Sequence, residues 1–163
     1  MVSRGSPLNR LSVNSGLDGN RYFNKRGDME KKEITVFIDG ASRGNPGEAG
    51  CGAVIYGVRD KPVYLTRYLG HATNNVAEYN ALILALEKLK ELNIKKIHIN
   101  SDSLLLVSQL NGKYAVKNPN IRKLFRVYTS LAVHFDTIIV QHIPRELNRE
   151  ADRLANLAID EKE

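Results

Sequence analysis

Four acidic residues have types and positions that suit metal-dependent chemistry: Asp39, Glu78, Asp102 and Asp152. If their carboxylates converge, they raise one another's pKa, because like charges a few ångströms apart oppose ionisation. A divalent cation resolves this conflict, and ligation by oxygen alone favours Mg²⁺ or Mn²⁺. Two such ions about 3.5–4 Å apart can clamp the attacking and leaving oxygens of a phosphodiester. The four acids therefore predict a two-metal site acting on a phosphate ester.

Two of these acids follow predicted strands, and each also has a simpler interpretation. Asp39 ends an apolar run, where it could turn the chain or accept hydrogen bonds from a glycine-rich loop. Asp102 lies between a strand and a helix, which is a preferred N-cap position. Taken singly, neither residue requires a metal.

The other two acids lie in early turns of predicted helices. Glu78 shares the core-facing stripe of its helix with Leu82, although Asn75 to Glu78 also has capping-box spacing. Asp152 lies beside the apolar stripe of the last helix, and its simpler interpretation is an exposed helical acid. Because ligands of open α/β sheets collect at the carboxyl ends of strands, the four together favour one site.

Hydrophobic periodicity places these acids on a mixed sheet. The Gly40–Gly50 segment is interpreted as a glycine-rich turn. The predicted elements, in order, are strands Ile34–Asp39, Gly52–Gly57 and Val63–Leu69, helix Asn75–Leu92, strand Lys96–Asn100, helices Ser103–Leu110 and Asn120–Val133, strand Thr137–His142, and helix Leu147–Ile159. This order predicts a mixed α/β fold with a five-stranded sheet. Three antiparallel meander strands come first, strands and helices then alternate, and helices cover both faces.

Composition predicts a single catalytic domain at residues 33–163, preceded by a flexible basic extension at 1–32. The extension carries +4 and the remaining residues +2, or +6 once the four acids are set aside as metal ligands. This charge is compatible with a polyanionic partner but is also common on surfaces that bind nothing. No apolar run approaches the roughly 20 residues of a membrane span. A single cysteine and no secretory signal favour the cytoplasm.

The residues around the four acids resemble the signature blocks of the type 1 ribonuclease H family. The blocks are DGASRGNPG at Asp39–Gly47, TNNVAE at Thr73–Glu78, SDS at Ser101–Ser103 and HIPRELNREAD at His142–Asp152. They occur in the family's order, and the resemblance covers about Ile34 to Ala158. It implies the ribonuclease H-like fold and a nuclease that cuts the RNA strand of RNA–DNA hybrids without strong sequence preference.

The resemblance also implies roles for the catalytic residues. Asp39 would bridge two Mg²⁺ ions, with Mn²⁺ as the alternative metal. Asp152 would help to hold the ion that activates water, and Glu78 and Asp102 the ion at the 3′-oxygen leaving group. Products would then carry 5′-phosphate and 3′-hydroxyl ends. His142 matches a mobile histidine that aids proton transfer or product release, although a strand-end surface histidine is the simpler interpretation.

Five further residues match the family's substrate contacts: Gly44, Asn45, Thr73, Asn74 and Asn75. The three asparagines would read the minor groove, where 2′-hydroxyls distinguish RNA from DNA. Thr73 would contact a phosphate of the DNA strand. Gly44 would let the backbone approach the substrate, unless it is only a turn glycine. The expected partner is the hybrid alone, with the protein a monomer that has no obligatory protein partner.

Several features depart from the family pattern. Leu104 stands where many relatives carry a polar groove-contacting residue, and no basic protrusion rich in Lys, Arg and Trp separates Asp102 from His142. Substrate grip could come instead from the extension or from Lys113, Lys117, Arg122, Lys123 and Arg126, which could equally be a solvated helix face. The alternative functions are a catalytically weak hybrid-binding module and a resolvase or integrase core of the same superfold.

Overall fold

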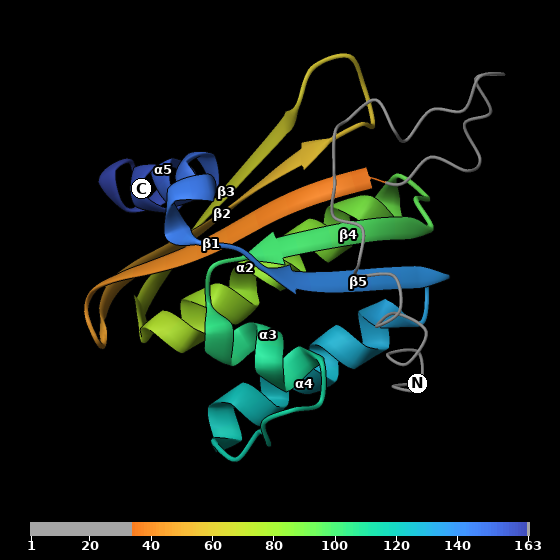
Figure 1. Ribbon diagram of the computed structural model, residues 1–163. Coiled ribbons are helices and arrows are strands. Elements are labelled where there is room, and N and C mark those ends of the chain that lie inside the picture. Colours follow the sequence, from red (N-terminus) through yellow and green to blue (C-terminus); the bar gives the residue numbers. More distant parts are fainter. Residues whose placement is uncertain (1–33, 163) are drawn as a thin grey trace, which may run out of the picture.

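A five-stranded sheet forms the frame of the protein in the computed structural model, which describes residues 34–162 (Figure 1). The predicted extension at 1–32 lies outside the described residues. The elements are β1 (Ile34–Gly44), β2 (Gly47–Tyr56), β3 (Val63–Ala72), α2 (Asn74–Glu91), β4 (Lys96–Ser101), α3 (Leu104–Leu110), α4 (Pro119–Ala132), β5 (Thr137–His142), the 3-10 helix η4 (Arg145–Leu147) and α5 (Arg149–Asp160).

The strand order β3-β2-β1-β4-β5 confirms the predicted mixed sheet. β1, β2 and β3 pair antiparallel because short turns join them, whereas β4 and β5 add in parallel after helical crossovers. The parallel half brings the carboxyl ends of β1, β4 and β5 to one side. That side is where the sequence predicted a site.

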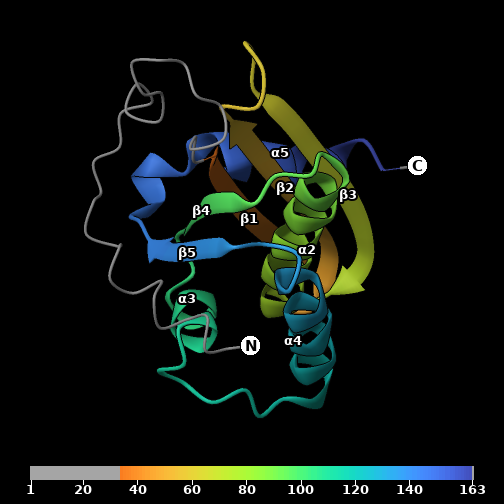
Figure 2. The ribbon, with the colours of Figure 1, turned by 90° about the vertical axis from the view of Figure 1, so that its right-hand side faces the viewer.

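Helices cover both faces of the sheet, as predicted (Figures 1 and 2). α2 packs on β1 and β2, α4 packs on α2, and α3 lies beside β4 and β5. On the opposite face α5 packs on the three antiparallel strands. Within residues 34–162, none of the helices combines the length and apolar character that a membrane span requires.

The predicted turn at Gly40–Gly50 is wrong, because β1 continues to Gly44 and β2 begins at Gly47. Only Asn45 and Pro46 connect the two strands. Gly40 and Gly50 serve close packing instead. A Cβ added at Gly50 would lie 2.7 Å from the carbonyl oxygen of Ala155 on α5, so the missing side chain lets the helix approach the sheet.

All four helix starts differ from their predicted positions by one or two residues: α2 begins at Asn74 instead of Asn75, and α3 begins at Leu104 instead of Ser103. α4 begins one residue early, at Pro119, because proline is favoured in the first helical turn and Asn118 caps it. α5 begins at Arg149, because Arg145–Leu147 form a separate 3-10 turn before it.

Candidate active site

Asp39 and Asp102 meet where the parallel ladder of β1 and β4 ends. The last pair in that ladder is Ile38 with Ser101, so each acid is the next residue along the chain, Asp39 within β1 and Asp102 just after β4. Asp39 is 5% exposed, and Asp102 is partly exposed. Beyond this point no strand within residues 34–162 pairs with β1 on the β4 side.

Glu78 reaches the same place from α2. A Cβ at Gly40, the residue after Asp39, would overlap the backbone of Ala77 and Glu78, so glycine allows this close approach. The predicted inward orientation is confirmed, because Glu78 is 9% exposed. The capping-box alternative is wrong, since the helix cap is Thr73, whose Oγ1 accepts from the Val76 N–H at 3.2 Å.

The capping alternative for Asp102 is also wrong. Ser103 is the N-cap of α3, and its Oγ accepts from the Leu106 N–H at 3.1 Å. The carboxylate of Asp102 therefore does not cap α3, and it lies near the carboxylates of Asp39 and Glu78 instead.

Asp39, Glu78 and Asp102 form one cluster, hereafter the acid cluster. Each offers a carboxylate oxygen, and the three oxygens lie within 4.8 Å of one another. Burial, followed by the charge of Asp102, raises the pKa of Asp39 from 3.8 to about 8. Burial, followed by the charge of Asp39, raises the pKa of Glu78 well above its usual value. Among the described residues, no Lys or Arg forms an ion pair with these three acids.

The cluster fits a divalent cation. Glu78 Oε1 is buried and has no hydrogen-bond partner among the described residues, and a buried acceptor in that state is costly. No Lys or Arg among residues 34–162 pairs with the cluster, so a bound cation would supply the missing positive charge. Carboxylate oxygens alone suit a hard cation such as Mg²⁺ or Mn²⁺.

Asp152 joins the site from the other face of the sheet. It lies in the first turn of α5 and is partly exposed. The Asp152 carboxyl group also contributes to the raised pKa of Asp39, after burial and the charge of Asp102. The structure thus brings three predicted acids into one tight group and places the fourth beside Asp39.

Asn148 is a residue of the site that the sequence did not single out. It is 1% exposed, and its Nδ2 donates to the Ile38 carbonyl at 2.9 Å and lies 3.5 Å from Asp102 Oδ2. Its Oδ1 is buried without a partner in the described part of the chain. Asn148 therefore links the start of α5 to both strands that carry acids. The available signal was a polar residue immediately before a helix.

His142 ends β5 on the same side of the sheet. It pairs in register with Ser101, the residue before Asp102, and its side chain is exposed. The predicted strand-end position is confirmed. Its register and exposure are compatible with a mobile group at the edge of the acid cluster.

Four of the five predicted substrate residues, all except Gly44, line a pocket of about 390 Å³. The pocket is lined by Asn45, Thr73, Asn74, Asn75, Val76, Asn118, Asn120 and Ile121. Asn45 Oδ1 accepts from the Asn74 N–H at 2.9 Å, which fastens the β1–β2 turn to the start of α2. Gly44 precedes this turn with a φ of +110°, a conformation that favours glycine, so its turn role is confirmed. The contribution of α4 was not predicted.

Comparisons with known proteins agree with this geometry. The family described as reverse transcriptase-like matches residues 37–158. Ribonuclease HI of Halobacterium salinarum is 38% identical over 130 residues, which are 78% of this chain and 65% of that protein. The chain belongs to the type 1 ribonuclease H family. The predicted family and fold are therefore both confirmed.

Solved type 1 ribonuclease H structures superpose closely on this chain. The ribonuclease H1 of H. salinarum has a TM-score of 0.74 at 39% identity, covering 78% of this chain and 98% of that one. LC11-RNase H1, solved in complex with an RNA/DNA hybrid, has a TM-score of 0.74 at 39% identity, covering 78% and 97%.

The N-terminal RNase H domain of a Mycobacterium tuberculosis protein has a TM-score of 0.75 at 40% identity, covering 78% of this chain and 99% of that one. The full mycobacterial protein, described as bifunctional, is 41% identical over 130 residues, and the chain spans 36% of its length. The match is therefore to one domain of a longer protein.

Proposed function

We propose that this ribonuclease H is an endonuclease that hydrolyses the RNA strand of RNA–DNA hybrids without strong sequence preference. The observation that carries the proposal is the acid cluster, with three converging carboxylates and no ion-pair partner in residues 34–162. Likeness to an RNase H1 solved with a hybrid supports the substrate.

Asp39, Glu78, Asp102 and Asp152 would hold the metal, two Mg²⁺ ions in preference to Mn²⁺. Bound there, these ions would supply the positive charge that activates water and stabilises the 3′-oxygen leaving group, giving 5′-phosphate and 3′-hydroxyl ends. Asn148 would help to orient the metal-binding carboxylates. Its Nδ2 donates to the carbonyl of Ile38, the residue before Asp39, and to Asp102 Oδ2. The carboxylates are thus oriented before substrate arrives.

The pocket beside the acid cluster would hold the hybrid. Asn45, Asn74 and Asn75 line it, and their side-chain amides can both donate to and accept from a 2′-hydroxyl in the minor groove. Thr73 already caps α2, so a phosphate contact would be made in addition to that structural role. Gly44 would let the turn backbone approach the duplex.

We further propose that the catalytic domain spans residues 33–163 and that the protein acts as a monomer in the cytoplasm without an obligatory protein partner. The single Cys51 is buried, and burial raises the pKa of its thiol to about 12, so it is unreactive at neutral pH. Size-exclusion chromatography with light scattering should give the mass of one chain. A stable dimer would contradict the monomer.

The central test uses end-labelled RNA–DNA hybrid, single-stranded RNA and duplex DNA of one sequence, with Mg²⁺, with Mn²⁺ or with a chelator. We expect cutting of the RNA in the hybrid alone, only with added metal, and ligation-competent 5′-phosphate products. Equal cutting of duplex DNA would favour a nuclease of the resolvase or integrase type. Tight hybrid binding without cutting under any metal would favour the hybrid-binding module.

His142 is proposed to transfer a proton or aid product release from its exposed position at the end of β5. The His142→Ala variant should lower kcat by roughly 10²-fold, within the range for a lost general acid or base. The matched control is His134→Ala, because His134 is also exposed but follows α4. Equal kcat for the His142→Ala variant and the wild type would mean that His142 is only a surface residue.

A further inference from the structure

Residues 103–135 form an acid-free stretch of the chain. These 33 residues contain five Lys or Arg and no Asp or Glu, whereas acids and bases are mixed elsewhere. The five are Lys113, Lys117, Arg122, Lys123 and Arg126. The stretch covers α3, the loop that replaces the missing protrusion, and α4.

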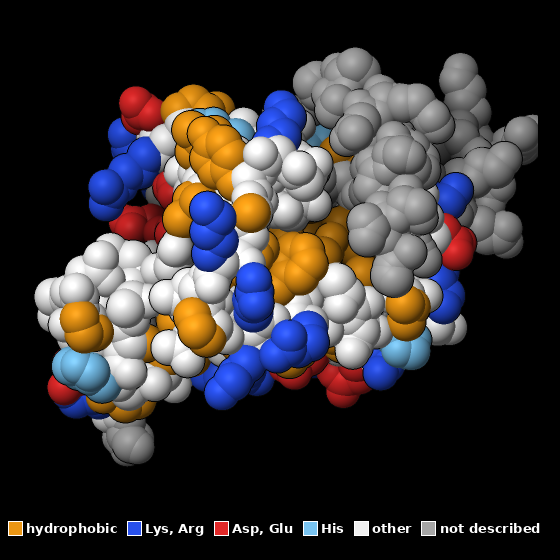
Figure 3. Space-filling model, turned by 90° about the horizontal axis from the view of Figure 1, so that it is seen from below, with side chains coloured by type: hydrophobic (Ala, Val, Ile, Leu, Met, Phe, Trp, Pro, Cys, Tyr) orange, Lys and Arg blue, Asp and Glu red, His pale blue; other side chains and the backbone are white. Residues whose placement is uncertain are grey.

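All five side chains reach solvent without a neutralising partner. Each is exposed, and none of them forms an ion pair with an acid within residues 34–162. Figure 3 views the molecule from the side of α4, and Lys and Arg form a run across the middle of this face while carboxylates lie toward its margins. The charge of the stretch is therefore available to a polyanion.

Three of the five lie along one side of α4, and we name them the α4 basic face: Arg122, Lys123 and Arg126. Ile121 is the buried residue of this helix and marks its opposite side. Arg122 and Arg126 are one turn apart, about 6 Å along the axis. Arg122 Nε donates to the Val116 carbonyl at 3.0 Å, which fixes this side chain relative to the preceding loop.

Hydrogen bonds connect the stretch to α2, the helix that carries Glu78. Tyr79, the residue after Glu78, donates its hydroxyl to Gln109 Oε1 at 2.7 Å in a buried hydrogen bond. Gln109 Nε2 in turn donates to the Ala115 carbonyl at 3.2 Å. Two hydrogen bonds therefore connect Tyr79, the residue after Glu78, to the loop before α4.

The pocket of the expected minor-groove residues continues into the same stretch. Asn118 and Asn120 line the pocket; Lys117 directly precedes Asn118, and Arg122 lies two residues after Asn120. A duplex seated in the pocket would thus lie against α4 as it leaves the acid cluster. A duplex carries one negative charge per about 1.7 Å of its axis, so even a short overlap presents several phosphates.

We propose that the α4 basic face binds backbone phosphates of the hybrid duplex and supplies the grip that the missing protrusion would otherwise give. The proposal rests on the proposed function, since it concerns the same substrate. The α4 basic face would contribute to substrate binding and not to the chemical step. The affinity for the hybrid should therefore depend strongly on these three residues, and kcat should not.

The test compares two triple variants with equal loss of charge. The α4-face variant is Arg122→Gln/Lys123→Gln/Arg126→Gln, and the control is Arg59→Gln/Lys61→Gln/Lys90→Gln, in which all three residues are likewise exposed. Arg59 and Lys61 lie in the β2–β3 turn, on the opposite side of the molecule from α4 (Figure 1). Cleavage kinetics are measured with Mg²⁺, and hybrid binding is measured by fluorescence anisotropy with a chelator across a salt series.

For the α4-face variant we expect KM to rise about 10-fold with kcat within about 2-fold of the wild type. The slope of log affinity against log salt should become shallower by roughly 2–3, since each lost phosphate contact removes about 0.9. The control should change neither value appreciably. Equal changes in both variants, or none in the α4-face variant, would overturn the proposal.

The measurements distinguish an error in the proposed nuclease activity from an error in the proposed phosphate binding by the α4 basic face. If the wild-type protein bound the hybrid but never cut it, the nuclease activity would be disproved, while the binding series would still test the α4 basic face. If the wild type cut the hybrid and the α4-face variant matched it in KM and salt slope, only the surface proposal would fail.

Discussion

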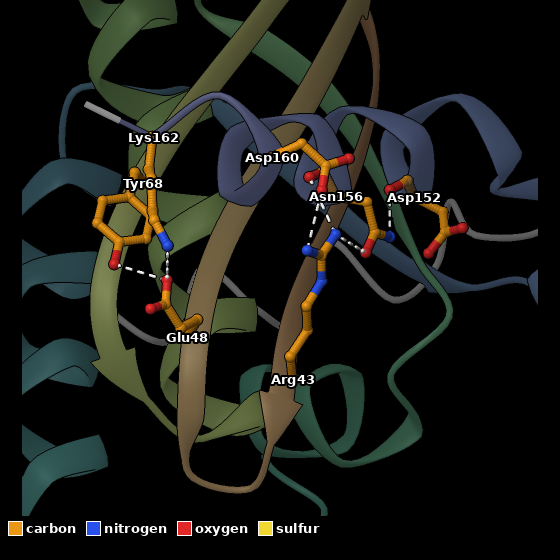
Figure 4. Close-up of polar contacts among 7 residues, drawn as sticks. All are labelled: Arg43, Glu48, Tyr68, Asp152, Asn156, Asp160 and Lys162. Carbon is orange, nitrogen blue, oxygen red and sulfur yellow. Dashed lines mark hydrogen bonds and ion pairs between the residues drawn. The ribbon is translucent and has the colours of Figure 1, made fainter.

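Carboxylates occupy two contrasting environments in this protein. In the acid cluster, Asp39 and Glu78 are buried without a cationic partner in the described residues, and the pKa of each is raised. At the far end of the β1–β2 hairpin, Glu48 accepts from Lys162 at 2.7 Å and from Tyr68 at 2.9 Å, and these hydrogen bonds lower its pKa (Figure 4). The exposed carboxylate of Glu48 thus has a cationic partner in the chain, whereas the buried carboxylates of the acid cluster have none among the described residues.

The exposed region also fastens the helix that carries the fourth acid. Arg43 forms an ion pair with Asp160 at 2.9 Å and donates to Asn156 Oδ1 at 3.2 Å (Figure 4). Asn156 Nδ2 in turn donates to the backbone carbonyl of Asp152 at 3.0 Å. Paired charges here attach α5 to the hairpin, whereas the unpaired charges of the acid cluster are left to bind a cation.

The largest effect should come from removing one unpaired carboxylate. The Asp39→Asn variant should lose hybrid cleavage by roughly 10³-fold or more, because its electrostatic contribution acts at the reacting atoms. Its metal-free stability should not fall, since the amide cannot ionise at a site where burial already disfavours the charged form of Asp39. The control is Glu48→Gln, which should cleave like the wild type within about 2-fold. Retained activity in the Asp39→Asn variant would remove Asp39 from the metal site.

A second effect should appear in the pH dependence of stability without metal. The pKa of Asp39 is about 8 in the folded protein against 3.8 as its ordinary value. Between these pH values the unfolded chain has released this proton and the folded chain retains it, so the free energy of unfolding should fall as pH rises. One proton corresponds to about 1.4 kcal/mol per pH unit. Glu48 has a lowered pKa and contributes the opposite trend only below about its ordinary value of 4.5.

Urea denaturation in a chelator at pH 5 to 8 measures this slope. Adding Mg²⁺ at pH 8 should restore stability, because the cation replaces the proton as the partner of the carboxylates. The Asp39→Asn variant should show a flatter profile than the wild type. Stability that rises with pH over this range in the chelator would contradict the raised pKa of the acid cluster.

The sequence predicted the acids more reliably than the backbone around them. Periodicity placed Glu78 on the inward face of its helix, and the order of elements placed Asp39 and Asp102 at one side of the sheet; the structure confirms both. The failure was the Gly40–Gly50 turn. Glycine permits a turn, but it also permits a helix to approach a strand, and only the packing of α2 and α5 distinguishes these uses.

Contacts between segments far apart in the chain could not be predicted. Asn148 bonds to Ile38 across 110 positions, and no local pattern marks such a hydrogen bond. The N-cap of α3 could not be predicted either, since both Asp102 and Ser103 are favoured N-cap residue types. The structure distinguishes them, because Ser103 caps α3 while the Asp102 carboxylate lies near Asp39 and Glu78.

The smallest effect should come from the exposed, paired region. Arg43 and Asp160 have side chains 46% and 59% exposed, so a double-mutant cycle of Arg43→Ala and Asp160→Ala should give a coupling energy below about 1 kcal/mol. The coupling should weaken in about 1 M salt, where the screening length falls to roughly 3 Å. Hybrid cleavage by the Arg43→Ala variant should stay within about 2-fold of the wild type. A coupling above about 2 kcal/mol, or a 10-fold loss of cleavage, would mean that the contact through Asn156 positions Asp152, and the two regions would then act as one.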